Sequence, residues 1–377
     1  MALTPRLAAA ATLSLTLLAT PAATAATAGA PAAATSRATL VGPTEPDGAF
    51  RDPATYDLAI AHITDTQYLS RCANSIMADQ ARRCQAIYDG MSRWIVDNAA
   101  PRKIAYTAHT GDIVDSYWFQ TPNLAKGEFA HASQAQQILD DAGMPNGVLP
   151  GNHDNARGAD ASLYNRYFGP ARYEAAGARA TTPYYQGPWK DGDNSHHVDE
   201  FTAGGARFAV VYLGYKPSDA ALAWADEQIK KRPRTNVVVA THAYLQPGAA
   251  PAGENAPLSD DGARVRTVVD ANPNVFLVLA GHEHGVGRNV RQDVGTPGHQ
   301  VVELMADYQD YDAGADGRGH AGFVRMLQLD VKRGELTVDT YSPSLDSFRS
   351  RDYDTKAGRH YDGSEDEFTV AVPLIKD

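Results

Sequence analysis

The sequence is poor in cysteine and in positive charge. It has two cysteines among 377 residues, with no C-x-x-C motif and no spacing typical of a thiolate zinc site. A small disulfide-stapled scaffold is therefore excluded. Lys and Arg number 34 against 45 Asp and Glu, a formal net charge of −11. This balance disfavours a nucleic acid polymer as the main partner, because such binding depends on many basic contacts to phosphate.

Long hydrophobic runs are missing after the N-terminus. There, Arg6 precedes an apolar run over residues 7–19, and the small-residue patterns 23–25 and 26–28 follow. This order is typical of a secretory signal peptide, which we assign to residues 1–28. The alternative, an alanine-rich tail, is disfavoured by the leucines clustered at residues 13–18. No later segment approaches the roughly 20 apolar residues of a membrane span. We expect a secreted protein, extracellular or in the cell envelope.

Export bears on Cys72 and Cys84, which lie 12 residues apart in a stretch with helical character. An oxidising compartment permits a disulfide between them. Cysteines with this separation do not share a helical turn, so a disulfide requires a break near residues 73–78. The alternative is two free buried thiols, and neither state implies catalysis.

The chain beyond the signal peptide divides into a linker and one domain. Residues 29–53 are rich in Ala, Pro, Thr and Gly with little periodicity, which predicts a flexible linker. Residues 54–377 contain no internal repeat and favour a single domain. Strands are expected at 57–63, 103–109, 148–149, 197–202, 207–213, 236–240, 275–280, 301–304, 323–329, 335–341 and 368–374, and helices at 77–98, 128–141, 218–231 and 262–269. Alternating strands and helices that give way to strands predict an α/β fold of packed sheets with helices outside.

Residues that commonly bind metals follow the predicted strands. The clusters are Asp65 and Gln67, Gly111-Asp112, Gly151-Asn152-His153-Asp154, Thr241-His242, and Gly281-His282-Glu283-His284. Each cluster alone has a plain alternative, such as a loop histidine pair or a capping aspartate. All of them, however, come directly after the carboxyl end of a strand, the edge where ligand sites of α/β sheets assemble. Together they predict one site.

This series of motifs resembles the calcineurin-like metallophosphoesterase superfamily, in the manner of a secreted bacterial member, over about residues 57–341. The family's pattern has His where this chain has Gln67. The resemblance implies two packed mixed β-sheets flanked by helices, an α/β/β/α sandwich, with the metal site at the carboxyl ends of the strands. It also implies two metals bridged by Asp112. The first metal site would contain Asp65, Gln67, Asp112 and His284, and the second Asp112, Asn152, His242 and His282. His153 would face the substrate.

The chemistry fits these residue types. Two divalent cations about 3.5–4 Å apart bridge a water, convert it to hydroxide at neutral pH and neutralise phosphoryl oxygens. Asp, Asn and His ligands without Cys suit divalent transition metals, with Mn²⁺, Fe²⁺ or Zn²⁺ as the leading candidates. His153 would protonate the leaving group or stabilise the transition state. A neighbouring carboxylate, Asp115 or Asp154, would raise its pKa toward that role.

Two features leave alternatives open. The neutral amide of Gln67 binds metal less strongly than imidazole, so the first metal site is expected to be weak or to prefer a harder ion such as Mn²⁺. The alternative is that Gln67 does not bind the metal directly and lies outside the ligands of that site. Aromatic side chains near the motifs, with Tyr117 and Tyr308 as the candidates, either contact the substrate or pack in the core.

These observations predict a secreted dinuclear-metal phosphoesterase. The nucleophile would be the metal-bridging hydroxide, with Asp112 and His153 as catalytic residues. The substrate would be a small or polymeric phosphate ester, with phosphodiesters favoured over monoesters, and the protein is expected to be a monomer. The alternatives are a phosphomonoesterase with the same site and a non-catalytic, metal-stabilised binding protein.

Overall fold

A computed structural model describes residues 48–312, 320–355 and 361–376, which belong to one compact unit. The predicted signal peptide and residues 29–47 of the predicted linker lie outside the described residues. The linker was expected to extend to residue 53, but Phe50 already stacks on Trp94, with ring centroids 5.4 Å apart. The backbone N–H of Arg51 also donates to Asp339 Oδ2 over 3.0 Å. Packing against the domain therefore begins before residue 53.

Sheet A is the six-stranded sheet, with strand order β13-β12-β11-β1-β2-β3. Its strands are β1 (Leu58–Ile63), β2 (Ile104–His109), β3 (Asn146–Val148), β11 (Val324–Asp330), β12 (Glu335–Tyr341) and β13 (Phe368–Ala371). β1, β2 and β3 are parallel, whereas β11, β12 and β13 pair in antiparallel fashion. The parallel strands therefore have their carboxyl ends at one edge.

Sheet B has seven strands in the order β4-β5-β6-β7-β8-β10-β9. They are β4 (Tyr185–Lys190), β5 (Asp193–Ala203), β6 (Ala206–Leu213), β7 (Asn236–Thr241), β8 (Val275–Ala280), β9 (Gly285–Arg291) and β10 (Val301–Asp307). β6, β7, β8 and β10 are parallel to one another. This mixed sheet also has its parallel carboxyl ends at a single edge.

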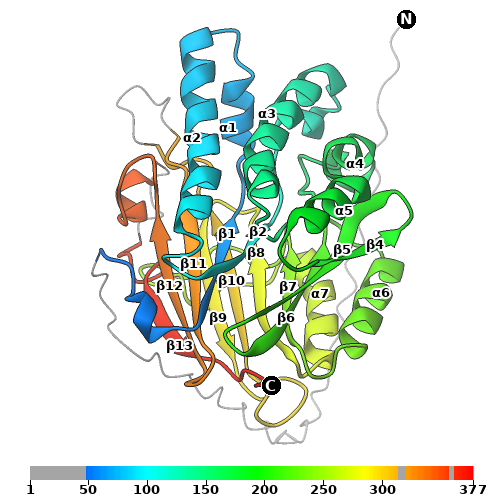
Figure 1. Ribbon diagram of the computed structural model, residues 1–377, viewed down its shortest axis with the longest axis vertical. Coiled ribbons are helices and arrows are strands. Elements are labelled where there is room, and N and C mark those ends of the chain that lie inside the picture. Colours follow the sequence, from blue (N-terminus) through cyan, green and yellow to red (C-terminus); the bar gives the residue numbers. More distant parts are fainter. Residues whose placement is uncertain (1–47, 313–319, 356–360, 377) are drawn as a thin grey trace, which may run out of the picture. The chain divides into compact units, whose positions relative to one another are not determined.

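Helices cover the outer face of each sheet (Figure 1). α1 (Gln67–Ala73), α2 (Ala78–Asn98) and α3 (Pro122–Asp141) pack on sheet A, and α6 (Asp219–Lys230) and α7 (Asp260–Ala271) pack on sheet B. α4 (Ser162–Phe168) and α5 (Pro170–Arg179) join the hydrophobic cluster on the sheet A side and also contact β5 and β4 of sheet B. Alternation along β1 shows why both faces are buried: Ala59 and Ala61 face the helices, whereas Leu58 and Ile60 join the core between the sheets. The predicted α/β/β/α sandwich is confirmed.

The helical stretch around the cysteines is interrupted where a disulfide required it. α1 ends at Ala73, α2 begins at Ala78, and Cys72 and Cys84 form a disulfide with Cα atoms 5.8 Å apart. The predicted helix 77–98 corresponds closely to α2. The elements α1, α4, α5, β4 and β9 were not predicted. None of the helices in the described part of the chain has both the length and the apolar character that crossing a bilayer requires.

Candidate metal centre

The loops after β1 and β2 have an unusual backbone conformation. Asp65 and Asp112 have φ values of 51° and 52°, in the left-handed region that residues other than glycine rarely adopt. Both side chains point into tightly packed space, because a Cβ atom at Gly281 would overlap the Asp65 carboxylate and one at Gly151 would overlap that of Asp112. Backbone strain of this kind is typically retained at functional sites.

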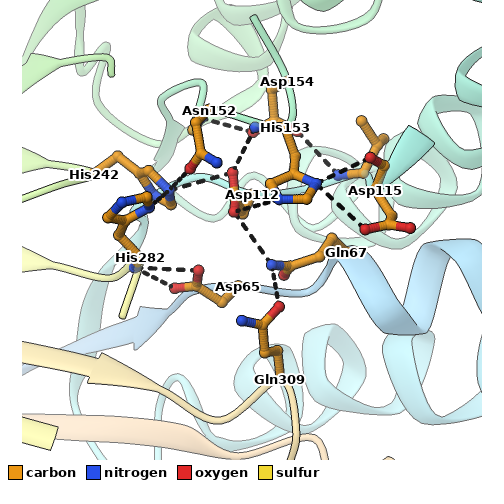
Figure 2. A network of polar contacts seen from close by, with 12 residues as sticks. Asp65, Gln67, Asp112, Asp115, Asn152, His153, Asp154, His242, His282 and Gln309 are labelled. Carbon is orange, nitrogen blue, oxygen red and sulfur yellow. Dashed lines mark hydrogen bonds and ion pairs between the residues drawn. The ribbon is translucent and has the colours of Figure 1, made fainter. Parts of the chain in front are cut away.

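Side-chain atoms of three residues lie close to Nε2 of His242. Its Nδ1–H donates to the carbonyl oxygen of Thr110 over 2.8 Å, which leaves Nε2 as an acceptor in the neutral ring. That Nε2 lies 2.7 Å from Asn152 Oδ1, 3.2 Å from Asp112 Oδ1 and 3.2 Å from His282 Nδ1 (Figure 2). Nε2 and the two oxygens are all acceptors, and acceptors this close need a cation or a proton between them.

The electrostatics of His242 agree with that reading. Burial lowers the pKa of His242, but the adjacent Asp112 carboxylate outweighs burial and raises it. The ligand atoms of Asp112, His242 and His282 lie within 4.8 Å of one another. Together with Asn152, these residues fit the second metal site.

Asp112 lies at the centre of the network. Its Oδ1 accepts from the backbone N–H of His153 over 3.0 Å, and its Oδ2 accepts from Gln67 Nε2 over 3.2 Å. Although burial raises the pKa of Asp112, His242 and the other nearby histidines lower it to about 2. An ionised carboxylate with each oxygen directed to a different side suits a bridging ligand.

The first metal site is only partly assembled. Both oxygens of Asp65 lie 3.2 Å from the backbone nitrogen of His282. Gln67 opens α1, and its Nε2 donates to Asp112 and Gln309. The predicted third member, His284, instead has its Nε2 2.9 Å from Asp354 Oδ1 and its Nδ1 3.4 Å from Asp310 Oδ2. Metal binding by His284 stays a prediction.

His153 is held on two sides. Its Nδ1 lies 3.0 Å from the carbonyl oxygen of Asp115 and 3.3 Å from Asp115 Oδ1, and its ring stacks on Trp118. Burial lowers the pKa of His153, but Asp115 and Asp112 outweigh burial and raise it to about 9. Of the two predicted carboxylate partners, Asp115 is the one in contact. Asp154 instead accepts backbone N–H groups, including that of Gly151 over 2.7 Å.

The two tyrosines predicted as substrate contacts are buried. The hydroxyl of Tyr117 donates to Asp160 over 2.6 Å, and that of Tyr308 donates to Asp366 over 2.5 Å. Both side chains belong to hydrophobic clusters, so their contact with substrate stays a prediction.

Sequence reasoning missed Asp307 and Gln309 as members of the site. Gln309 hydrogen-bonds Gln67, and Asp307 in turn accepts from Gln309. The reason is the predicted length of β10. That strand was expected to end at Leu304, so Asp307 was not placed at the carboxyl end of a strand.

The chain matches the model of the calcineurin-like phosphoesterase family over residues 58–286, and it belongs to that family. The match begins at β1 and ends two residues after His284, so it includes each predicted metal ligand. Calcineurin-like phosphoesterases use a dinuclear divalent metal centre, and the ligand types assembled around Asp112 fit such a centre.

Similar proteins extend the comparison. The uncharacterized protein YvnB of Bacillus subtilis is 31% identical over 294 residues, which cover 76% of this chain and 20% of that protein. The chain thus spans about a fifth of the length of this relative. A dimetal phosphatase from Danio rerio shares 14% identity, with a TM-score of 0.45, over 76% of this chain and 97% of that one. A purple acid phosphatase from yellow lupin seeds shares 10% identity, with a TM-score of 0.45, over 85% of this chain and 55% of that one.

Proposed function

We propose that this protein is a secreted phosphoesterase with a dinuclear metal centre, and that it favours phosphodiesters. The observation that carries the proposal is the convergence of acceptor atoms from Asp112, Asn152, His242 and His282. His153, a group able to carry a proton, lies beside them with its Nε2 3.9 Å from Asp112 Oδ2. Metal ligands next to a proton donor are the parts that phosphoester hydrolysis needs.

The residues of the chain have separate tasks in this proposal. Bound metals supply an activated water and neutralise the phosphoryl oxygens. Asp115 accepts the Nδ1–H of His153 through its carbonyl oxygen, which leaves Nε2 free to face the substrate. Because its pKa is raised to about 9, His153 is protonated at neutral pH. It then donates its Nε2 proton to the leaving oxygen.

Local charge bears on the choice between diesters and monoesters. The carboxylates of Asp65, Asp112 and Asp307 are buried at the centre, and that of Asp115 lies beside His153. A phosphodiester carries one negative charge, whereas a monoester carries nearly two at neutral pH. The carboxylates disfavour the second negative charge of a monoester, whereas two bound divalent cations favour it, so the measured rates on the two esters decide the preference. Both small and polymeric esters are compatible with this argument.

The disulfide supports export. Disulfides form and persist in oxidising compartments, and Cys72 and Cys84 are joined in this chain.

Sequencing the N-terminus of protein recovered from the culture medium tests the signal peptide, with a start near residue 29 expected. Size-exclusion chromatography with light scattering tests the expected monomer.

The central experiment measures metal content and hydrolysis together. The purified mature chain is analysed for bound metals, and its activity on an aryl phosphodiester is compared with that on the matching monoester. Asp112→Ala and His153→Ala are assayed beside His131→Ala, a control at a histidine on α3 that contacts Gln85. We expect two metals, faster diester hydrolysis, and loss of activity in the first two variants only. A wild-type chain without transition metal, or equal activity in all variants, contradicts the proposal.

Gln67 motivates the second candidate, a non-catalytic metal-stabilised binding protein. Its amide stands where the family's pattern has imidazole, which weakens the first metal site. This candidate predicts bound metal without hydrolysis of either ester, so the same experiment separates the two functions. Faster hydrolysis of the monoester would instead identify a phosphomonoesterase.

A further inference from the structure

Another carboxylate stands at the sheet edge that carries the metal centre. Asp307 is the last residue of β10, which runs parallel to β8 with Met305 paired to Ala280. Asp307 follows Met305 by two residues, just as His282 follows Ala280, so both reach the same level of sheet B. The Asp307 side chain is completely buried, with 0% exposure. Asp307 ends a parallel strand of sheet B, and Asp65 lies just beyond the end of a parallel strand of sheet A. The two residues therefore have similar positions at the carboxyl ends of their strands.

Gln67 provides an independent sign of a missing ligand. Its side chain is 1% exposed, and its Nε2 donates to Asp112 and Gln309. Its Oε1 is buried and has no hydrogen-bond partner among the residues that the structure describes. A buried amide oxygen without a partner is costly, and a cation would satisfy it.

Gln309 connects this amide to Asp307. Its backbone N–H donates to Asp307 Oδ1 and its Nε2 donates to Asp307 Oδ2, each over 2.8 Å. Figure 2 shows the Gln309 amide directly next to that of Gln67, on the side away from Asp112. Asp112, Gln67, Gln309 and Asp307 thus form one continuous polar chain. A cleft lined by Thr64, Asp65, Tyr68 and Gln309, among others, borders this chain.

We infer that Asp307 is a ligand of the first metal site, where its carboxylate compensates for the imidazole that Gln67 replaces. This inference rests on the proposed function, because it assumes the metal pair. Carboxylates from Asp65, Asp112 and Asp307 with the Gln67 amide oxygen would make this site rich in oxygen, with His284 as its single predicted imidazole ligand. Such a site prefers Mn²⁺ to Zn²⁺, whereas imidazole ligands shift the preference toward Zn²⁺.

The test titrates Mn²⁺ into the metal-free full chain and records stoichiometry by calorimetry and spin coupling by electron paramagnetic resonance. Wild type is expected to bind two Mn²⁺ as a coupled pair. Asp307→Asn is expected to keep one uncoupled Mn²⁺ in the second metal site. Loss of a residue that hydrogen-bonds a metal ligand weakens metal binding roughly 10- to 100-fold. Loss of a direct ligand should therefore weaken Mn²⁺ binding by more than about 100-fold.

Glu303→Gln is the matched control. Glu303 is a buried carboxylate on the same strand, and it accepts from the hydroxyl of Tyr244 over 2.6 Å instead of facing the metals. This variant is expected to bind two coupled Mn²⁺ like wild type. The double variant Asp307→Asn/Gln67→Glu restores the number of carboxylates and is expected to regain the second Mn²⁺.

A second measurement does not depend on the folding of any variant. Wild-type crystals grown with Mn²⁺ are expected to show two anomalous peaks, one within bonding distance of an Asp307 oxygen. Two peaks that both lie outside bonding distance of Asp307 would overturn the inference. A folded Asp307→Asn protein that binds two coupled Mn²⁺ with an affinity within about tenfold of wild type would also overturn it. Failure of the proposed function looks different, because wild type would then bind no Mn²⁺ pair, or would bind the pair without hydrolysing either ester.

Discussion

The imidazole ring of His153 stacks on the indole of Trp118, with ring centroids 4.8 Å apart and planes inclined by 21°. The guanidinium of Arg157 lies over the same indole, 4.0 Å from the ring centroid. Asp115 holds Nδ1 of the imidazole at its edge. The ring plane of His153 and the direction of its Nε2 are thus fixed by two separate contacts.

Removal of the stacking partner is expected to slow turnover without affecting metal binding. An aromatic pair contributes about 0.5–1.5 kcal/mol, so Trp118→Ala should lower kcat by about 2- to 10-fold. Trp118→Phe retains a ring and should keep most of the activity. Steady-state kinetics with metal analysis of both variants provide the check. Equal losses in the two variants would show that stacking does not position His153.

The alkaline limit of activity should depend on Asp115. The pKa of His153 is about 9 because Asp115 and Asp112 favour the charged ring over the effect of burial. Activity that requires protonated His153 is therefore present below this pKa and is lost as the pH rises through it. Asp115→Asn removes one favourable charge, so the alkaline limb should move to lower pH. Profiles of kcat against pH for both proteins measure this shift, and an unmoved limb would argue against His153 as the acid.

Chelation of the metals should destabilise the fold. A ligand that binds only the folded state adds about 2.7 kcal/mol per site when present at a hundred times its Kd. Treatment with a chelator should therefore lower the melting temperature of wild type by several degrees. In a His242→Ala/His282→Ala protein, which lacks two ligands of the second metal site, the effect should be much smaller. Calorimetry with and without chelator compares them.

Gln67→His should tighten the first metal site. The substitution restores the imidazole of the family's pattern, and changes around a metal ligand commonly alter affinity by about 10- to 100-fold. The dissociation constant of the weaker metal is the quantity to compare. If that constant is unchanged, Gln67 lies outside the direct ligands.

Loss of the disulfide should lower stability by an amount set by its loop. Cys72 and Cys84 are 12 residues apart, and closing a loop of that length is worth about 3 kcal/mol in the chain-entropy model. Cys72→Ala/Cys84→Ala should lose a similar amount of unfolding free energy in urea. Reductant should destabilise wild type but leave this variant unaffected, and equal sensitivity of the two proteins would refute the assignment.

Much of the frame was readable from the sequence because local patterns determined it. The strand over residues 57–63, the helix over 77–98 and the strand over 275–280 appear within one residue of their predicted bounds. Their apolar runs are long enough to identify the element type. By contrast, β9 begins with Gly-Val-Gly and has no apolar run, because it gains its place by pairing with β10.

The candidate site was predictable where a ligand follows a strand directly. Asp112, Asn152, His242 and His282 met this condition and lie together. The surroundings of His284 were not predictable, because its partner Asp354 is 70 residues away and arrives through tertiary packing alone. The same limit applies to the contact between Gln67 and Gln309, which are separated by 242 residues.

The residues assigned to the metals come from both layers of the sandwich. Asp65, Asp112 and Asn152 follow strands of sheet A, whereas His242, His282 and Asp307 follow or end strands of sheet B. Any cation pair held there would link the two sheets at one end of a mainly apolar interface, in which Tyr106 and Asp199 form a further polar contact. Removal of the metals would then loosen this end of the two sheets and leave it more exposed to proteolysis.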